Sequence, residues 1–195
     1  MKTLIFKGHR LNIKIETLYL NEEETRLIEN ALIILGESVN SGAFENFVLN
    51  YTWHKTYYKR KWFRKIWYTK NGDNFRWNNG LSSEEIFDKI MSGAETLDPS
   101  HDKEIDIHLK VDRRNKRGVV GYTYPNTKWQ WIYKWVLRSY DEYDIAGNLL
   151  HEWCHKIGFD HEYRFSPLRE FTVPYALGRF VSRYRHAEVN GTFTS

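Results

Sequence analysis

A spacing of histidines in the last third of the chain constrains the fold more than any other feature. Residues 151–161 read HEWCHKIGFDH, which places His151 and His155 four positions apart. Side chains four apart share one face of an α-helix, so a helix here brings both imidazoles to one point. Gly158 can adopt the left-handed backbone that ends a helix, which would turn the chain and return His161 to that point. The segment therefore predicts a helix, a turn and three converging histidines.

Three converging imidazoles beside a carboxylate are typical of a catalytic zinc site. Imidazole nitrogen binds Zn²⁺ at about 2.0–2.1 Å, and three protein ligands leave a fourth position open for water or substrate. Glu152 lies next to the first ligand and is not needed as a ligand, so it can take a proton from water. We therefore predict one Zn²⁺ ion held by His151, His155 and His161, with Glu152 as the general base.

Several neighbours of the motif have alternative interpretations. Cys154 lies roughly 60° from His151 on a helical wheel, close enough for a metal ligand, but we favour a buried small apolar residue. Asp160 and Glu162 either orient the ring of His161 or lie in solvent as loop charges. The other histidines have no ligand spacing and are expected to be structural or exposed; they are His9, His54, His101, His108 and His186.

The extended pattern H-E-x-x-H-x-x-G-x-x-H resembles the signature of the metzincin clan of zinc peptidases. The stretch at residues 158–162, GFDHE, is most similar to the astacin-like branch, where a glutamate also follows the third histidine. The signature covers residues 151–161 of a chain of 195 residues. The resemblance implies a zinc-dependent metalloendopeptidase.

One part of the metzincin pattern is missing from this chain. Metzincins place a methionine in a tight turn beneath the metal, commonly followed two residues later by a tyrosine, and here no methionine follows Met91. The nearest match is FTVPY at residues 171–175, in which Val173 stands where the methionine is expected. The resemblance then implies that Tyr175 stabilises the oxyanion near the metal. The alternative for Tyr175 is a core aromatic that packs under the site.

The order of predicted elements is also similar to the upper subdomain of that clan. Alternating apolar and polar residues predict a strand at residues 11–19. Asn21 is suited to cap a long helix whose apolar stripe runs up to Gly36. Ser82 or Ser83 is expected to cap a shorter helix.

Further strands are expected before the histidine motif. They lie at residues 104–111, 119–124 and 130–137, and Asp144 is expected to cap the helix that carries the histidines. We therefore predict an α+β fold of the zincin or metzincin type. It would have a twisted mixed β-sheet, a long helix, a zinc-bearing active-site helix and a small C-terminal helical part. Residues 1–195 are expected to form one metallopeptidase-like domain.

The segment VVGYTY at residues 119–124 is the candidate edge strand of this fold. An extended substrate can add to such an edge as a further strand, which makes Gly121, Tyr122 and Thr123 candidate substrate-binding residues. An ordinary sheet strand is the alternative interpretation.

A basic and aromatic stretch at residues 51–77 predicts a twisted hairpin, inserted in the domain around residues 51–80. Asn71-Gly72 is a two-residue turn signal. Cationic strands with interleaved aromatic side chains can follow phosphates and stack on bases, which would indicate a nucleic-acid partner. We favour a solvated face in which long lysine and arginine stems cover the rings. A wall of the substrate cleft that prefers acidic or extended peptides is a third interpretation.

Composition and the distribution of apolar residues indicate in which compartment the protein is found and which partners it has. A single cysteine excludes an intramolecular disulfide, and a net charge of +4 is weak evidence for any anionic partner. The N-terminus has no apolar run long enough for a signal peptide, and no stretch approaches a membrane span. We therefore expect a soluble cytoplasmic protein without a membrane partner, unless lysis or a route without a signal peptide releases it. The oligomeric state is left open.

The predicted function is hydrolysis of peptide bonds in a protein or peptide substrate. Two alternatives stay open. One is a zincin-fold protein that binds protein or nucleic acid without protease activity, which would keep its binding in a Glu152→Gln variant. The other is a zinc amidase that acts on cell-wall peptide, which would hydrolyse peptidoglycan in place of protein.

Overall fold

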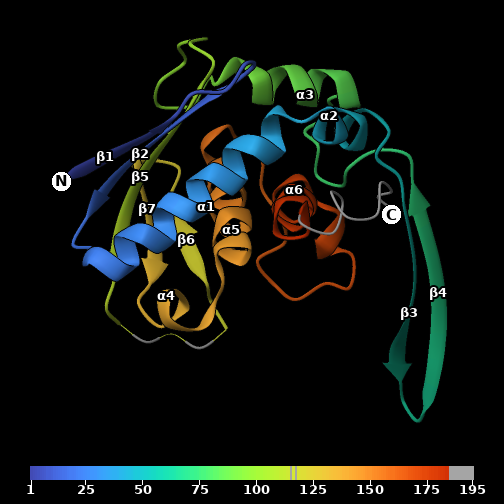
Figure 1. The fold of residues 1–195 in the computed structure, drawn as a ribbon. Helices are drawn as coiled ribbons and strands as arrows, with labels where there is room; N and C mark the ends of the chain where they lie inside the picture. The colour runs from blue at the N-terminus through green and yellow to red at the C-terminus, as the bar shows by residue number, and fades with distance from the viewer. Residues whose placement is uncertain (115, 117, 185–195) are drawn as a thin grey trace.

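The chain folds around a five-stranded mixed β-sheet that is covered on one face by helices (Figure 1). The computed structural model describes residues 1–114, 116 and 118–184. The sheet has the order β1-β2-β5-β7-β6. Its strands are β1 (Lys2–Phe6), β2 (Asn12–Leu18), β5 (Glu104–Asp112), β6 (Gly121–Thr123) and β7 (Trp129–Tyr133). Strands β2, β5 and β7 run parallel, whereas β1 and β6 are antiparallel to their neighbours at the two edges. This arrangement confirms the predicted α+β class and mixed sheet.

The predicted strands are all present, but β6 spans only Gly121–Thr123 of the expected residues 119–124, and the strand after it also ends early. Alternate residues of β2 and β5 are buried, as expected for strands with one covered face. The strand expected at residues 130–137 ends at Tyr133, because Val136–Ser139 form the short helix α4. Val136 and Leu137 of this helix are both buried.

Helix α1 (Glu22–Asn40) begins where the sequence predicts and ends later. The Asn21 side chain accepts a hydrogen bond from the Glu24 amide at 2.8 Å, and the Glu24 carboxylate accepts one from the Asn21 amide. The predicted end at Gly36 is wrong. A Cβ atom on Gly36 would lie 2.3 Å from the ring of Phe6, so this glycine lets the helix pack closely against β1. The sequence patterns did not predict β1.

The predicted hairpin is present, but its turn lies elsewhere. Strands β3 (Trp53–Lys61) and β4 (Arg64–Gly72) pair antiparallel, and the chain reverses at Trp62 and Phe63. Asn71-Gly72 ends β4 instead of forming the turn. A Cβ atom on Gly72 would lie 2.6 Å from Nε1 of Trp53, so the glycine makes room for the Trp53 ring at the base of the hairpin.

Shorter helices complete the chain. Helix α3 (Ser83–Ser92) begins at an N-cap formed by Ser82, one of the two predicted positions. Helix α2 (Gly42–Leu49) follows α1 and was not predicted. Helix α5 (Glu142–Lys156) contains the first two histidines of the motif, and α6 (Val173–Ser182) follows the third. No helix in the described residues is both long and apolar enough to cross a bilayer.

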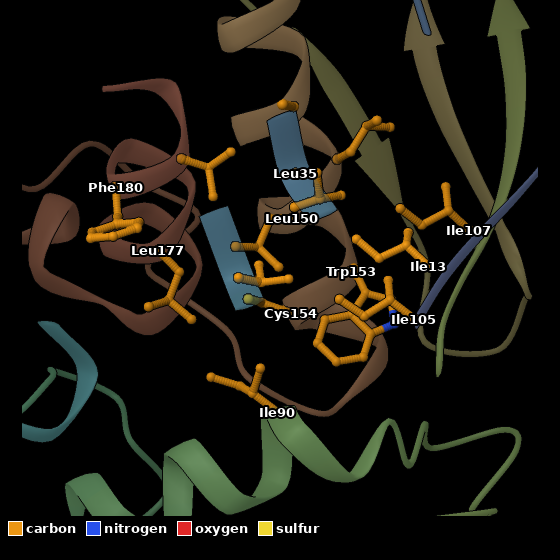
Figure 2. Packing of buried hydrophobic residues seen from close by; sticks show 14 of the residues in the cluster. Ile13, Leu35, Ile90, Ile105, Ile107, Leu150, Trp153, Cys154, Leu177 and Phe180 are labelled. Carbon is orange, nitrogen blue, oxygen red and sulfur yellow. The ribbon is translucent and has the colours of Figure 1, made fainter. Parts of the chain in front are cut away.

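The hydrophobic core lies between the sheet and the helices (Figure 2). Its labelled side chains include Ile13, Ile105 and Ile107 from the sheet, Leu35 from α1, Leu150, Trp153 and Cys154 from α5, and Leu177 and Phe180 from α6. Burial of each large side chain stabilises the fold by about 1.5–3 kcal/mol. The fully buried Trp153 also donates a hydrogen bond from Nε1 to Glu95 at 2.6 Å. The core thus holds α5 by one face and leaves another face for the histidines.

Candidate metal centre

The helix that carries the motif begins and ends at defined residues. Asp141, and not the predicted Asp144, is the N-cap of α5: its side chain accepts a hydrogen bond from the Asp144 amide at 3.0 Å. The helix ends at Lys156, and Gly158 has a φ of +90°. This left-handed conformation was predicted from the motif, and it turns the chain back towards the helix.

The three motif histidines come together at the end of α5. Their candidate ligand atoms all lie within 4.8 Å of one another, which is close enough for a metal ion to bind after small side-chain rotations. The ring centres are 5.2 Å apart for His151 and His155, 5.2 Å for His151 and His161, and 4.9 Å for His155 and His161. No other group of three or more potential ligands was found in the described part of the chain.

The surroundings keep these imidazoles neutral, which is the form that binds a metal. Burial, and after it the neighbouring His155, lower the pKa of His161 to about 4. Burial also lowers the pKa values of His151 and His155. Neutral rings at neighbouring positions avoid mutual repulsion and present lone pairs to an ion.

Hydrogen bonding selects the nitrogen of His155 that can bind the ion. Nδ1 of His155 lies 2.8 Å from the carbonyl oxygen of Phe159. A carbonyl can only accept, so Nδ1 is the donor and Nε2 keeps its lone pair for a ligand bond. The Pro174 carbonyl accepts a similar bond from the ring of His151. These contacts are the support that metal-binding histidines ordinarily have, so the donor set fits a divalent ion of the zinc class.

Glu152 follows His151 on α5 and is buried. Only 6% of its surface is exposed, and burial raises its pKa to about 8. A side-chain hydrogen bond with Asn148, one turn earlier on α5, lowers the pKa in part. A nearby dication favours the ionised form of a carboxylate, so this residue is suited to accept a proton only when a metal is close.

Tyr175 lies against the histidines, as the predicted role requires. The centre of its ring is 4.5 Å from that of His151 and 4.9 Å from that of His161. Val173 is fully buried at the first position of α6.

A glycine pair that the sequence reasoning missed brings α6 to the site. A Cβ atom on Gly178 would lie 2.8 Å from the Gly147 carbonyl oxygen and 3.2 Å from the His151 Cβ. Because neither glycine has a side chain, α5 and α6 cross in direct contact, and the first turn of α6 carries Tyr175 to His151. The available signal was two glycines inside helical segments, where glycine is otherwise unfavourable.

Arg169 is a second residue that the sequence reasoning missed. It begins the 3-10 helix η1 (Arg169–Phe171), and its guanidinium carbon lies 4.6 Å from the centre of the Tyr175 ring. After burial, its charge is among the causes that lower the pKa of His161 and of its two partners. Its Nε atom is buried and has no hydrogen-bond partner among the residues that the structure describes. No spacing in the sequence connects this arginine with the motif.

The residues that flank the ligands have supporting positions. Asp160 accepts a hydrogen bond from the His161 amide at 2.8 Å, and its carboxylate lies 3.8 Å from Nδ1 of His155. Glu162 forms an ion pair with Arg76 at 2.6 Å. Cys154 is fully buried and burial raises the pKa of its thiol, so it is a core residue, as favoured from the sequence.

The remaining histidines lie away from the cluster. His108 pairs with Glu16 at 2.9 Å, and the others that the structure describes, His9, His54 and His101, are exposed. His186 lies outside the described residues.

Strand β6 is the edge of the sheet next to β7, at the position predicted for it. A Cβ atom on Gly121 would lie 2.7 Å from Oδ1 of Asn148, so the glycine allows α5 to approach this edge. The Tyr122 hydroxyl donates to Asp112 at 2.8 Å, and the Thr123 hydroxyl donates to a backbone carbonyl of β7. The hydroxyls of Tyr122 and Thr123 therefore form hydrogen bonds within the fold. A further chain would pair with the backbone of β6.

A buried lysine joins the end of α5 to this edge. Nζ of Lys156 donates to the carbonyl oxygens of Tyr124, Thr127 and Trp129, in the connection from β6 to β7. Burial lowers the pKa of Lys156. The lysine thus fixes the edge strand relative to the helix that carries the histidines.

No protein-family model matches this chain, and no curated protein or solved structure matches it at a significant level.

Proposed function

We propose that this protein is a zinc-dependent endopeptidase of the metzincin type. The observation that carries the proposal is the cluster of three neutral histidines within 4.8 Å, with a buried carboxylate next to the first of them. His151, His155 and His161 would hold the ion. Zinc is favoured because three imidazoles and one open position are typical of its catalytic sites.

The residues around the ligands have separate roles in this proposal. When bound, zinc would supply Lewis acidity to the substrate carbonyl and to water. Glu152 accepts the proton of the attacking water and passes it to the leaving amine. Tyr175 donates a hydrogen bond from its hydroxyl to the developing oxyanion, and the guanidinium beside its ring, that of Arg169, adds positive charge at the same place.

The position of β6 supports a peptide as the substrate. Its outer edge has no partner strand in the described sheet, and Lys156 and Gly121 hold it beside α5. An extended peptide would pair with the backbone of Gly121, Tyr122 and Thr123, and its scissile bond would face the histidines. A strand that pairs along its length accepts the middle of a chain, which favours internal cleavage.

Metal removal and return tests the proposal. The purified protein is expected to contain zinc close to one ion per chain, and to lose both the zinc and the hydrolysis of a peptide library on dialysis against a chelator. Zinc, added back, should restore activity, and magnesium should not, because it prefers oxygen ligands. Absence of zinc from protein never exposed to chelator would contradict the proposal. Cleavage of peptidoglycan but not of peptides would favour the amidase alternative.

Tyr175→Phe tests the oxyanion role of the tyrosine. We expect kcat to fall about tenfold to a hundredfold, with KM and zinc content close to those of the parent, because the hydroxyl acts mainly in the transition state. Steady-state kinetics measure the two constants separately. Tyr163→Phe is the matched control, since Tyr163 is exposed and its hydroxyl donates to Asp160 next to the third histidine. Equal kcat values for both variants and the parent would assign Tyr175 to packing alone.

A further inference from the structure

The hairpin of β3 and β4 carries a charge that the rest of the chain does not share. Residues 53–72 contain seven lysines and arginines and no aspartate or glutamate, whereas the whole chain has a net charge of +4. The remainder of the chain therefore has a net charge of −3. Figure 1 shows the hairpin extending away from the sheet and helices, so this positive charge lies on a projecting arm.

Four cations lie next to the turn; we call them the tip cations. In the strand register Arg60 lies opposite Lys65, and Lys61 lies opposite Arg64. Like charges directly opposite each other destabilise a strand pair. Within the described part of the chain, none of the four forms an ion pair. Their mutual repulsion would be relieved by an anionic partner.

The turn itself presents two aromatic rings to solvent. Trp62 is 86% exposed and Phe63 is 96% exposed. The φ of Trp62 is +58°, a left-handed conformation that glycine or asparagine adopts more readily than a bulky residue. Local stability alone would thus favour another residue at this position, and the exposed indole has no role in packing the fold.

The aromatic residues further along the strands are engaged within the hairpin. Tyr57 and Tyr68 stack across the strands with ring centres 5.6 Å apart, and Tyr58 and Trp67 meet edge to face at 5.4 Å. The Lys65 ammonium lies 4.7 Å from the centre of the Tyr58 ring. These contacts stabilise the hairpin and cover part of these rings, so that Trp62 and Phe63 at the turn are its most exposed apolar side chains.

We propose that this hairpin is a peripheral anchor for bilayers that contain anionic phospholipids, in place of the absence of a membrane partner that was expected from the sequence. Trp62 and Phe63 enter the interfacial region, where aromatic side chains are favoured, and the tip cations lie at the level of the headgroup phosphates. Shallow insertion, about 5–10 Å, is enough for an amphipathic element to bind, and the anionic surface adds attraction for each cation. The anchor holds the protein at the surface and leaves the rest of the chain in water.

The arrangement favours a lipid surface over single-stranded nucleic acid. Binding of a single strand uses a row of free aromatic faces along a cationic groove. Here the rings along the strands contact each other in pairs, and the two most exposed rings are grouped at one end with the cations directly behind them. The apolar rings at the end of the hairpin would lie in the interfacial region of a bilayer, and the tip cations behind them would lie at the level of the phosphates.

The test is co-flotation of the protein with vesicles of phosphatidylglycerol and phosphatidylcholine in equal parts, compared with phosphatidylcholine alone. The parent is expected to float with the anionic vesicles at low salt and to dissociate at high salt. Trp62→Gly with Phe63→Ser should lower the partition coefficient at least about tenfold, because the insertion of both rings is lost. Glycine suits the positive φ, and circular dichroism would verify that the variant is folded.

Matched variants separate the anchor from general charge and from the metal centre. Arg60→Gln with Lys65→Gln should weaken binding severalfold, whereas Lys7→Gln with Arg26→Gln, two exposed cations elsewhere, should leave it unchanged. Glu152→Gln should float like the parent, since the anchor does not depend on catalysis. Unchanged flotation of the Trp62→Gly, Phe63→Ser variant would overturn the proposal. Binding of a single-stranded oligonucleotide in gel shifts, with no binding to anionic vesicles, would also overturn it.

Discussion

Glu152→Gln is expected to abolish peptide hydrolysis and to keep zinc bound. The amide has nearly the shape of the carboxylate but cannot accept the proton of the attacking water, so kcat should fall about a hundredfold to ten-thousandfold. The three histidines and their hydrogen bonds are untouched, so zinc content should equal that of the parent. Elemental mass spectrometry and initial rates on one peptide substrate measure both quantities.

The structure also indicates that this variant will fold. Burial raises the pKa of Glu152 to about 8, which means that the fold tolerates the neutral form better than the charged one. A neutral amide is therefore no harder to bury. Glu142→Gln is the matched control, since Glu142 lies on the first turn of the same helix, about 15 Å away along its axis at 1.5 Å per residue. Parental turnover in the Glu152→Gln variant would rule out its assignment as the general base.

His155→Ala is expected to remove the metal and the activity together. The substitution deletes one of three ligands, and zinc affinity should fall on the order of a thousandfold. It also leaves the Phe159 carbonyl without the hydrogen bond that it accepts from Nδ1, which loosens the turn leading to His161. Titration with a competing chelator gives the affinity, and the peptide assay gives the activity.

A histidine outside the cluster provides the control for this variant. His9 is exposed and far from the motif in sequence, so His9→Ala should have parental zinc affinity and turnover. Circular dichroism of His155→Ala in the absence of metal would separate loss of the ligand from loss of the fold. Zinc affinity equal to that of the parent would show that the histidines are not the ligands.

Most of the local structure of the site follows from short-range patterns. The spacing of His151 and His155 predicts a helix, and the left-handed Gly158 ends it and returns the chain to His161. Caps such as Asn21 and Ser82 were also recognisable, because a capping side chain and its amide partner lie within three residues of each other. Such features need only the residues next to them in the chain.

Two predictions were wrong where a glycine makes room for a side chain that is distant in the sequence. Gly36 was taken as a helix end and Asn71-Gly72 as a turn, but the first accommodates Phe6 and the second accommodates Trp53. A glycine that relieves a steric clash has the same local pattern as one that turns the chain. Only the three-dimensional neighbours distinguish the two uses.

The sequence pattern was sufficient to predict the histidine cluster, the adjacent carboxylate and the alternation of the sheet, since each depends on the periodic spacing of residues along one helix or strand. The surroundings of the ligands depend on how elements pack. Tyr175 reaches His151 because Gly147 and Gly178 let two helices cross in contact, and Arg169 reaches Tyr175 through a 3-10 turn that has no periodic signal. Contacts between residues far apart in the chain are set by the volume and burial of many side chains at once, and no local spacing encodes them.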